Sequence, residues 1–403
     1  MGKLKRFAIG SLVTLIALGG ATGLWYQRHY VLPPEPLYTK EILPSPNGFD
    51  TLREAAAQRV EQLDGVAFRA SLWKPSAPLE KRLALLAANQ ESIAQTRLGL
   101  TQPYLQPPVS WPQNHQATYQ QLHQQAMLLV FAAKTYADSG SYPEAMACAL
   151  DAIELGARLP RGGPLQSIYL GSACEAVGKR MAWELADKIE EDTAHAAVER
   201  LQRIQSERWP LADALQEERR VNPPPMRAMF ADGPIPGWKS VDNLLASYEQ
   251  PPLQTAGSWR TDAPQKSAWQ KKWERLWLQA RIVYYGPRTV LESTDGWLQE
   301  LKQDSLAPWN PDTHRRRPTD HPLSQLAEPF WVNEDLSQMD AQNQLPFLEA
   351  YLWLRVEFLA TGHYPPSAAM PRDPFSPTGG LLGYKTDGQS FTLWSVGPDG
   401  KDD

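Results

Sequence analysis

The sequence predicts a mainly α-helical protein: an N-terminal transmembrane helix, an α-helical body and a small C-terminal antiparallel β-hairpin unit. Three observations predict this class. An uncharged apolar run opens the chain, apolar residues at helical spacing recur through the body, and two short alternating runs around an Asp-Gly pair close it. With 403 residues and 42% hydrophobic content, the chain can form one large domain or two modest ones.

The first thirty residues predict a membrane anchor. A basic segment, 1–6, precedes the run 7–27, which carries no charged residue. This length matches the roughly 20 residues that a helix needs to cross the hydrocarbon of a bilayer. Trp25 and Tyr26 suit the far interfacial belt, and the positive-inside rule leaves the N-terminus in the cytoplasm. We therefore expect a single-pass protein of the inner (cytoplasmic) membrane with an extracytoplasmic body.

A cleaved signal peptide is the competing interpretation of the same residues. Residues 7–18 suit the hydrophobic region of a signal peptide, and the small residues after them suit a peptidase. No cysteine ends the run, which excludes a bacterial lipoprotein, and Arg6 stands where a myristoylation signal has Ser or Thr. Both interpretations export the body.

The charge of the body argues against nucleic acid as a partner. Residues 1–30 contain four basic residues and no acid, so the rest of the chain has 36 basic and 45 acidic residues, a net charge of −9. A negative surface attracts neither a phosphate backbone nor an anionic lipid surface as its main partner. The one basic run, 315–317, lies between prolines and is typical of a solvated loop.

A proline-rich segment, 31–47, predicts an extended stalk between the membrane and the body. A helical domain is expected over 48–206. Its first helix is indicated by helical spacing, with Asn47 or Asp50 as the N-terminal cap. The spaced residues are Phe49, Leu52, Ala56, Val60 and Leu63. A second helical pattern follows over 77–100.

The strongest helical pattern spans about 117–187 and predicts three helices, with a tight turn at Ser139-Gly140 between the first two. Those two helices resemble one tetratricopeptide-type pair, in which small residues allow close crossing and an aromatic side chain fills the groove. The matching residues are Ala132, Tyr136, Gly140, Tyr142 and Ala145. Because a solenoid normally needs three repeats, a generic antiparallel helical hairpin is the alternative.

The two cysteines suggest a disulfide. Cys148 and Cys174 are symmetric about residue 161, which lies in the turn between two of these helices. In an antiparallel pair they would lie at about the same height, and an extracytoplasmic compartment permits a bond between them. Two buried free thiols in a helix interface are the alternative.

Residues 207–340 are expected to form an irregular helical and loop region with proline-rich excursions. Within it, Trp269, Trp273 and Trp277 recur at positions i, i+4 and i+8 of a helix. Such a stripe could be a binding surface for carbohydrate or for a protein partner. A helix face packed against the core is the alternative.

The last unit, 341–403, is expected to contain a helix that ends at Gly362 and then a β-hairpin. Apolar residues alternate on both sides of Asp387-Gly388, which is a strong hairpin signal. They are Leu382 and Tyr384 before the turn and Phe391 and Leu393 after it.

A helix that ends in "GHYP" and leads to "DPFSPTGGLLGYKTDGQSFTLWSVGPDGKDD" resembles the C-terminal part of the type II secretion major pseudopilins. Uncharacterised, planctomycete-like bacterial membrane-anchored envelope proteins share this segment, and their middle is similar to "GSYPEA" and "LPRGGPLQSIYLGSA". A pseudopilin also needs a Gly-Phe peptidase site followed by a glutamate, whereas Arg6 precedes Phe7 here and Ser11 stands in place of the acid. The resemblance is therefore to a C-terminal module rather than to a pilus subunit.

In pseudopilins the last turn binds calcium, and the donors in this chain suit the same ion. Calcium takes six to eight oxygens, which a tight turn supplies as carbonyls and carboxylates. The matching positions are the Leu393 carbonyl, Ser395, Asp399 and Asp402 or Asp403, with Gly397 and Gly400 giving the turn its conformational freedom. A solvated acidic tail is the alternative.

No catalytic motif appears: there is no Gly-x-Ser-x-Gly elbow, phosphate loop, His-Glu-x-x-His or Cys-x-x-Cys. His314 and His321, with two aspartates, are the only clustered metal candidates, and no second cluster completes four ligands. The charged run 217–220 could hold a general acid but is typical of a solvated helix end.

We therefore expect a non-enzymatic, membrane-anchored extracytoplasmic protein that mediates protein interaction as a scaffold component of the bacterial cell envelope. The resemblance implies a secretion-related role with envelope proteins as partners. The alternative is an envelope hydrolase or glycan-binding protein, whose cleft would gather Trp238, Trp259 or Trp297 with an unpaired carboxylate.

Overall fold

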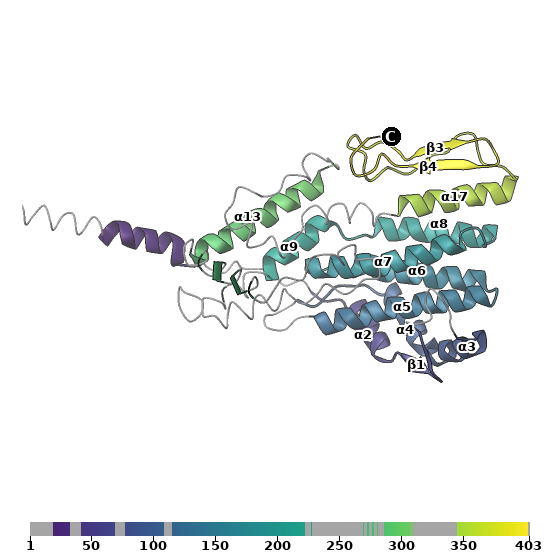
Figure 1. Cartoon of the computed structure of the whole chain (residues 1–403), viewed down its shortest axis with the longest axis horizontal. Coiled ribbons are helices and arrows are strands. Elements are labelled where there is room, and N and C mark those ends of the chain that lie inside the picture. Colours follow the sequence, from purple (N-terminus) through teal and green to yellow (C-terminus); the bar gives the residue numbers. More distant parts are fainter. Residues whose placement is uncertain are drawn as a thin grey trace, which may run out of the picture.

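The protein is mainly helical, with a small antiparallel hairpin at its C-terminal end (Figure 1). The computed structural model describes residues 19–32, 42–68, 77–108, 115–221, 286–307, 309 and 345–401, together with residues 227, 269, 272, 273, 276, 277 and 280.

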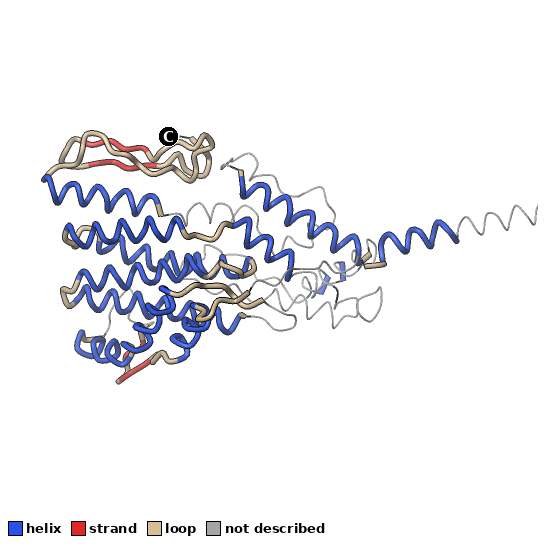
Figure 2. Tube along the Cα trace, turned by 180° about the vertical axis from the view of Figure 1, so that it is seen from behind, coloured by secondary structure: helices blue, strands red, loops and turns tan. Residues whose placement is uncertain are grey.

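Long helices lie side by side along one direction and make up the body (Figures 1 and 2). They are α5 (Gln116–Asp138), α6 (Tyr142–Arg158), α7 (Leu165–Leu185), α8 (Glu191–Ser206) and α17 (Pro346–Thr361). Helix α5 packs on α6 and α7, and α6 packs on α7 and α8. Although it comes much later in the sequence, α17 packs on α8 and ends the stack.

Shorter elements cover the other side of α5. They are α2 (Gly48–Ala57), β1 (Gln62–Leu63), β2 (Val66–Ala67), α3 (Leu79–Ala88) and α4 (Gln90–Thr101). The single helical pattern predicted over 77–100 is thus two helices that meet at Asn89, whose side chain points into the body and is buried.

The first body helix begins as predicted and ends earlier. The Asn47 Oδ1 accepts a hydrogen bond from the backbone N–H of Phe49, so this residue is the N-cap. The helix ends at Ala57 rather than reaching Leu63, because the side chain of Asn89 binds both the N–H and the carbonyl of Val60 at 2.9 and 3.0 Å. A tertiary contact thus replaces the intrahelical hydrogen bonds that Val60 would otherwise make.

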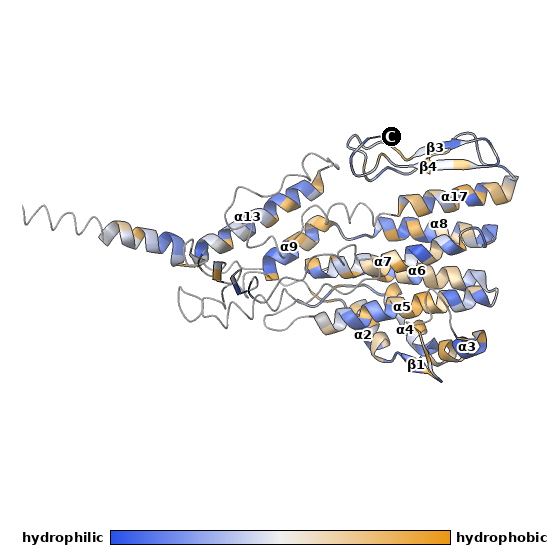
Figure 3. Ribbon diagram, viewed as in Figure 1, coloured by the Kyte–Doolittle hydropathy of each residue, from blue (hydrophilic) through white to orange (hydrophobic). Residues whose placement is uncertain are grey.

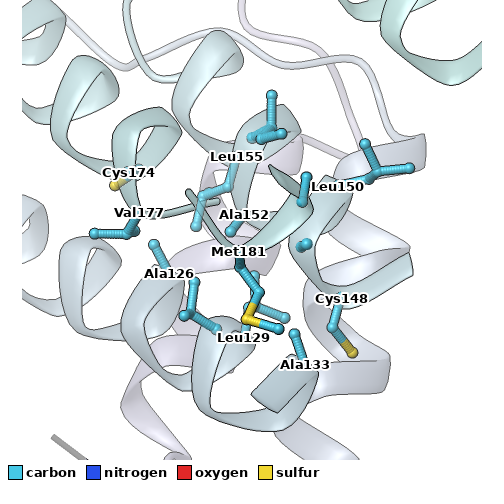
Figure 4. Packing of buried hydrophobic residues seen from close by; sticks show 14 of the residues in the cluster. Ala126, Leu129, Ala133, Cys148, Leu150, Ala152, Leu155, Cys174, Val177 and Met181 are labelled. Atoms are coloured by element: carbon cyan, nitrogen blue, oxygen red, sulfur yellow. The ribbon is translucent and has the colours of Figure 1, made fainter. Parts of the chain in front are cut away.

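One continuous hydrophobic core joins the stack (Figure 4). It contains residues of α2, α5, α6, α7, α8 and α17, among them the fully buried Leu52, Leu129, Leu155, Leu185, Leu201 and Leu352. Polar residues lie on the outer faces of the same helices (Figure 3). Helices α6 and α7 approach most closely at glycines: a Cβ on Gly156 would lie 2.5 Å from the Gly171 carbonyl oxygen.

A second, smaller cluster joins α9 (Leu211–Val221) and α13 (Pro287–Leu306) to the start of α7. Trp297 and Leu298 on α13 are buried against Leu165, Ile168 and Leu215. The Arg219 guanidinium also pairs with the Asp295 carboxylate at 2.7 Å, which links the two helices at their surface.

Within the described part of the chain, no helix is long and apolar enough to cross a membrane. Residues 7–18 of the predicted anchor lie outside that part, as do 33–41 of the predicted stalk. The described end of the anchor, residues 19–27, is helical; this helix continues to residue 30 and extends away from the body (Figure 1). We call it the N-terminal helix. Its His29 Nδ1 lies 3.1 Å from the Thr289 Oγ1 on α13.

Candidate functional site

The C-terminal unit is a hairpin packed over α17 (Figure 1). Strand β3 (Gly383–Thr386) pairs antiparallel with β4 (Phe391–Trp394), as the Asp-Gly signal predicts. In the turn, the Asp387 carboxylate accepts hydrogen bonds from the backbone N–H groups of Ser390 and Gln389, which lower the pKa of Asp387. Helix α17 ends at Gly362 in a left-handed conformation, also as predicted.

Asp373 organises the loops of this unit. Its Oδ1 accepts hydrogen bonds from the Phe375 N–H (2.9 Å) and the Ser395 hydroxyl (2.7 Å), and its Oδ2 accepts one from the Val396 N–H (2.8 Å). The residue is only 4% exposed. One buried carboxylate therefore fastens the chain that follows β4 to the loop that follows α17. Sequence reasoning assigned Asp373 no role, although the Asp-Pro-Phe triplet of the resemblance was the signal.

Trp309 closes the last turn from another part of the chain. Its indole Nε1–H donates to the Pro398 carbonyl at 3.0 Å, and its ring meets the Phe375 ring edge to face, with centroids 5.2 Å apart. Gly397 and Gly400 have φ angles of +73° and +70°, so both adopt the conformation for which glycine was predicted at these positions.

The predicted calcium donors are only partly free to bind a cation. The Ser395 Oγ donates to Asp373 and accepts from the Gly397 N–H at 2.9 Å, so this hydroxyl is already hydrogen-bonded in both roles. Leu393 lies in β4 opposite Tyr384. Asp399 is exposed. Among the described residues, no group of three or more His, Cys, Asp or Glu could hold a metal ion. A calcium site therefore depends on Asp402 and Asp403, which lie outside the described residues.

Both cysteines are buried free thiols, and the helix register explains why the predicted disulfide is not formed. Close contacts place Gly156 against Gly171 and Gly178 against Ala149. This register puts Cys148 opposite a point about five residues beyond Cys174, or about 8 Å along the helix axes. Figure 4 shows the two thiols on opposite sides of Met181. Symmetry about the midpoint of the turn therefore does not predict which residues of the two helices lie opposite each other.

Burial keeps these thiols protonated. It raises the pKa of Cys148 to about 12, with the nearby Asp151 carboxylate adding to the shift, and it raises the pKa of Cys174 as well. The Cys148 Sγ accepts a hydrogen bond from the Arg97 guanidinium at 3.3 Å. Neither cysteine is therefore poised as a nucleophile, because the thiolate is the reactive form.

A buried ionic cluster lies between α4, α6 and α8. Asp151 and Glu154, 2% and 5% exposed, share the guanidinium of Arg200, at 2.6 and 2.8 Å. Arg97 Nε contacts the second oxygen of Asp151 at 2.8 Å, and Arg158 pairs with Glu154 at 3.2 Å. Each buried carboxylate is compensated by at least two cations, so this cluster holds helices together. The i, i+3 spacing of the two acids on α6 was the available sequence signal.

The charged run 217–220 is not simply a solvated helix end. Glu217 and Arg220 pair with each other at the surface, but Glu218 is only 6% exposed. The Glu218 Oε2 accepts the backbone N–H of Leu165 at 3.0 Å, at the start of α7. Burial raises the pKa of Glu218 to about 7, and this hydrogen bond opposes the shift. Glu218 therefore serves as a buried contact between α9 and α7.

The predicted aromatic cleft is not found among the described residues. Trp297 is buried in the α9–α13 cluster, and Trp238 and Trp259 lie outside the described part of the chain, as do His314, His321 and the basic run 315–317.

The tryptophan stripe lies at the surface. Trp269, Trp273 and Trp277 are helical and 67%, 53% and 54% exposed. The alternative that this face packs on the core is therefore wrong. The rings of Trp269 and Trp273 contact each other edge to face, with centroids 5.6 Å apart. The interpretation as a binding surface stays a prediction.

No protein-family model, curated protein or solved structure matches this chain.

Proposed function

We propose that this chain is a non-enzymatic, membrane-anchored extracytoplasmic protein of the bacterial cell envelope. Its helical body is an interaction scaffold for envelope proteins, and its C-terminal unit is a docking module with a secretion-related role. The observation that carries the proposal is the order of helix contacts, in which α5 packs on α6 and α7, and α6 packs on α7 and α8. Stacked helical repeats, which are typically used to bind other proteins, share these contacts between neighbouring and alternate helices, although α7 and α8 do not pack on each other as a second pair.

The α5–α6 pair supports a tetratricopeptide-like interpretation. Ala132 and Ala145 are fully buried where the helices cross, and Tyr136 and Tyr142 are partly buried against the same core. Gly140 has a φ of +86° in the turn between the helices, a conformation that glycine adopts without strain. These environments support the resemblance of the pair to a repeat of this type.

Three of the buried carboxylates support a scaffold rather than a hydrolase. Asp151, Glu154 and Glu175 all form ion pairs with arginines, the last with Arg208 at 2.5 Å. A general acid or base must be able to reach a substrate. These carboxylates instead pair with arginines inside the body, where each arginine compensates for the desolvation of its carboxylate.

The test is mild cross-linking of the full-length chain in its own membranes, followed by recovery of attached proteins, with and without a calcium chelator. We expect secretion or envelope-assembly proteins to be enriched. Asp373→Ala, which loosens the C-terminal unit, should reduce their recovery, whereas Leu381→Ala on the exposed side of the same unit should not. Enrichment of no protein above background would refute the scaffold.

A further inference from the structure

An exposed aromatic face remains outside the scaffold. Trp269, Trp273 and Trp277 lie four residues apart on a helix, and each side chain is more than half exposed. The next described residues on this face are Leu276, which is half-buried, and Ala280, which is exposed. Contiguous exposed apolar patches of this kind mark sites of interaction with proteins, ligands or membranes.

This face lies near the end of the predicted membrane anchor. Gly286 approaches the His29 carbonyl so closely that a Cβ on Gly286 would overlap it. Because Trp277 precedes Gly286 by nine residues, the chain places Trp277 within about 30 Å of His29 even when fully extended. Figure 1 shows that α13, which begins just after Gly286, starts at the same end of the long axis as the N-terminal helix.

The segment is locally basic in an acidic protein. The residues "KSAWQKKWERLWLQAR", 266–281, contain five Lys or Arg and one Glu, a net charge of +4, whereas the whole chain carries −5. Among the described ones, Lys272 is exposed next to Trp273. The negative charge of the body as a whole thus does not extend to this segment.

We propose that the face formed by Trp269, Trp273 and Trp277 lies on the surface of the same bilayer that holds the anchor, as a second, peripheral contact with anionic lipid. Tryptophan favours the boundary between head groups and acyl chains, because its ring is apolar and its indole N–H still reaches polar groups. Lysine and arginine extend their charged ends to the head groups, and amphipathic helices with this composition lie in the plane of the interface.

The consequence is a fixed orientation. One anchor helix alone leaves the body free to rotate above the membrane, whereas a second contact within about 30 Å of His29 limits its tilt. The end of the body that carries α13 would then face the membrane, and the C-terminal hairpin unit would not. The inference rests on the proposed anchor, but the anchor and the tryptophan contact are measured by separate signals.

The test uses the full-length chain in vesicles of phosphatidylcholine with about a third of phosphatidylglycerol, an anionic surface. Flotation with the vesicles after alkaline washing reports the anchor. Quenching of tryptophan emission by brominated phosphatidylcholine reports which indoles touch acyl chains. The variant is Trp269→Ser, Trp273→Ser and Trp277→Ser together. Its control is Trp183→Ser with Leu83→Ser and Leu98→Ser, which are exposed on α7, α3 and α4.

We expect the triple tryptophan variant to float as the wild type does and to lose at least half of the quenched emission. The control should keep its quenching, and vesicles without phosphatidylglycerol should quench the wild type less. Equal quenching of the wild type and the triple variant would overturn the proposal while leaving the anchor intact. Those tryptophans would then face water, a glycan or a second protein. Failure of the wild type to float would overturn the anchor and the second contact together.

Discussion

At the scale of single residues, the C-terminal unit depends on one carboxylate. Asp373 accepts three hydrogen bonds while being 4% exposed. Asp373→Ala leaves two backbone N–H groups, one of them buried, and one hydroxyl without this acceptor, which should cost about 2–4 kcal/mol of unfolding free energy. Asp373→Asn keeps part of the acceptor set and should cost less. Hydrogen exchange of the Val396 amide measures the effect locally, and Leu381→Ala, at an exposed position of the same unit, is the control.

Unchanged protection of Val396 in Asp373→Ala would show that the loops are held by the Trp309 and Phe375 contact instead.

Glu218 should make the free energy of unfolding depend on pH. Its pKa rises from 4.5 to about 7 on folding. Because the folded state binds this proton more tightly, the stabilisation is complete below pH 4.5 and is lost as the pH rises through 7. The loss amounts to roughly 3 kcal/mol. Urea unfolding of the wild type and of Glu218→Gln between pH 4.5 and 8 isolates this contribution as the difference between the two curves. Parallel curves would show that Glu218 ionises normally.

Calcium binding by the last turn can also be tested with variants of single residues. If the last turn binds calcium, the metal should raise the unfolding midpoint of the full chain at millimolar concentration, since a ligand that binds only the folded state stabilises it. Asp399→Asn with Asp402→Asn should abolish this shift, and Asp387→Asn should not. Titration calorimetry with Ca²⁺ is the second measurement. Absence of heat and of any shift would identify the ending as a solvated acidic tail.

At the scale of secondary structure elements, glycines set how closely α6 and α7 pack. A Cβ on Gly156 would lie 2.5 Å from the Gly171 carbonyl oxygen and 2.6 Å from the Glu175 side chain. Gly156→Ala should therefore destabilise the protein by about 1–3 kcal/mol, because the helices must separate. Gly296→Ala on α13, which has no neighbour within 4 Å, should instead stabilise by roughly 0.5–1 kcal/mol through helix propensity. Chemical denaturation measures the free energy of unfolding of both variants. Equal changes in Gly156→Ala and Gly296→Ala would contradict the close packing of α6 and α7.

Element positions were mostly predictable, and their ends and register were not. The turn at Ser139-Gly140, the end of α17 at Gly362 and the Asp387-Gly388 hairpin follow from local backbone preferences, which act within a few residues. The early end of α2 and the break at Asn89 follow from one side chain binding Val60 across the fold. Local sequence carries no record of such a contact.

At the scale of the whole molecule, the last helix belongs to the main core. Leu352 on α17 is fully buried in the cluster that α2, α5, α6, α7 and α8 share. Leu352→Ala should cost about 2–5 kcal/mol and lower one common unfolding transition of the helical body. Leu381→Ala, 59% exposed, should change little. Tryptophan fluorescence and far-ultraviolet circular dichroism during unfolding make the comparison. Two separate transitions would show that α17 and the body unfold independently.

Local sequence patterns were enough to predict the helical class, the C-terminal hairpin and the positions of most turns, because periodicity and turn chemistry act over short distances. The assembled fold was needed to show that the cysteines are not bonded, that Glu218 and Trp297 are buried and that Trp269 is exposed. Two amphipathic faces with the same pattern can meet a core or face outward. The choice depends on which helices are free to cover them, and that is a property of the assembled chain.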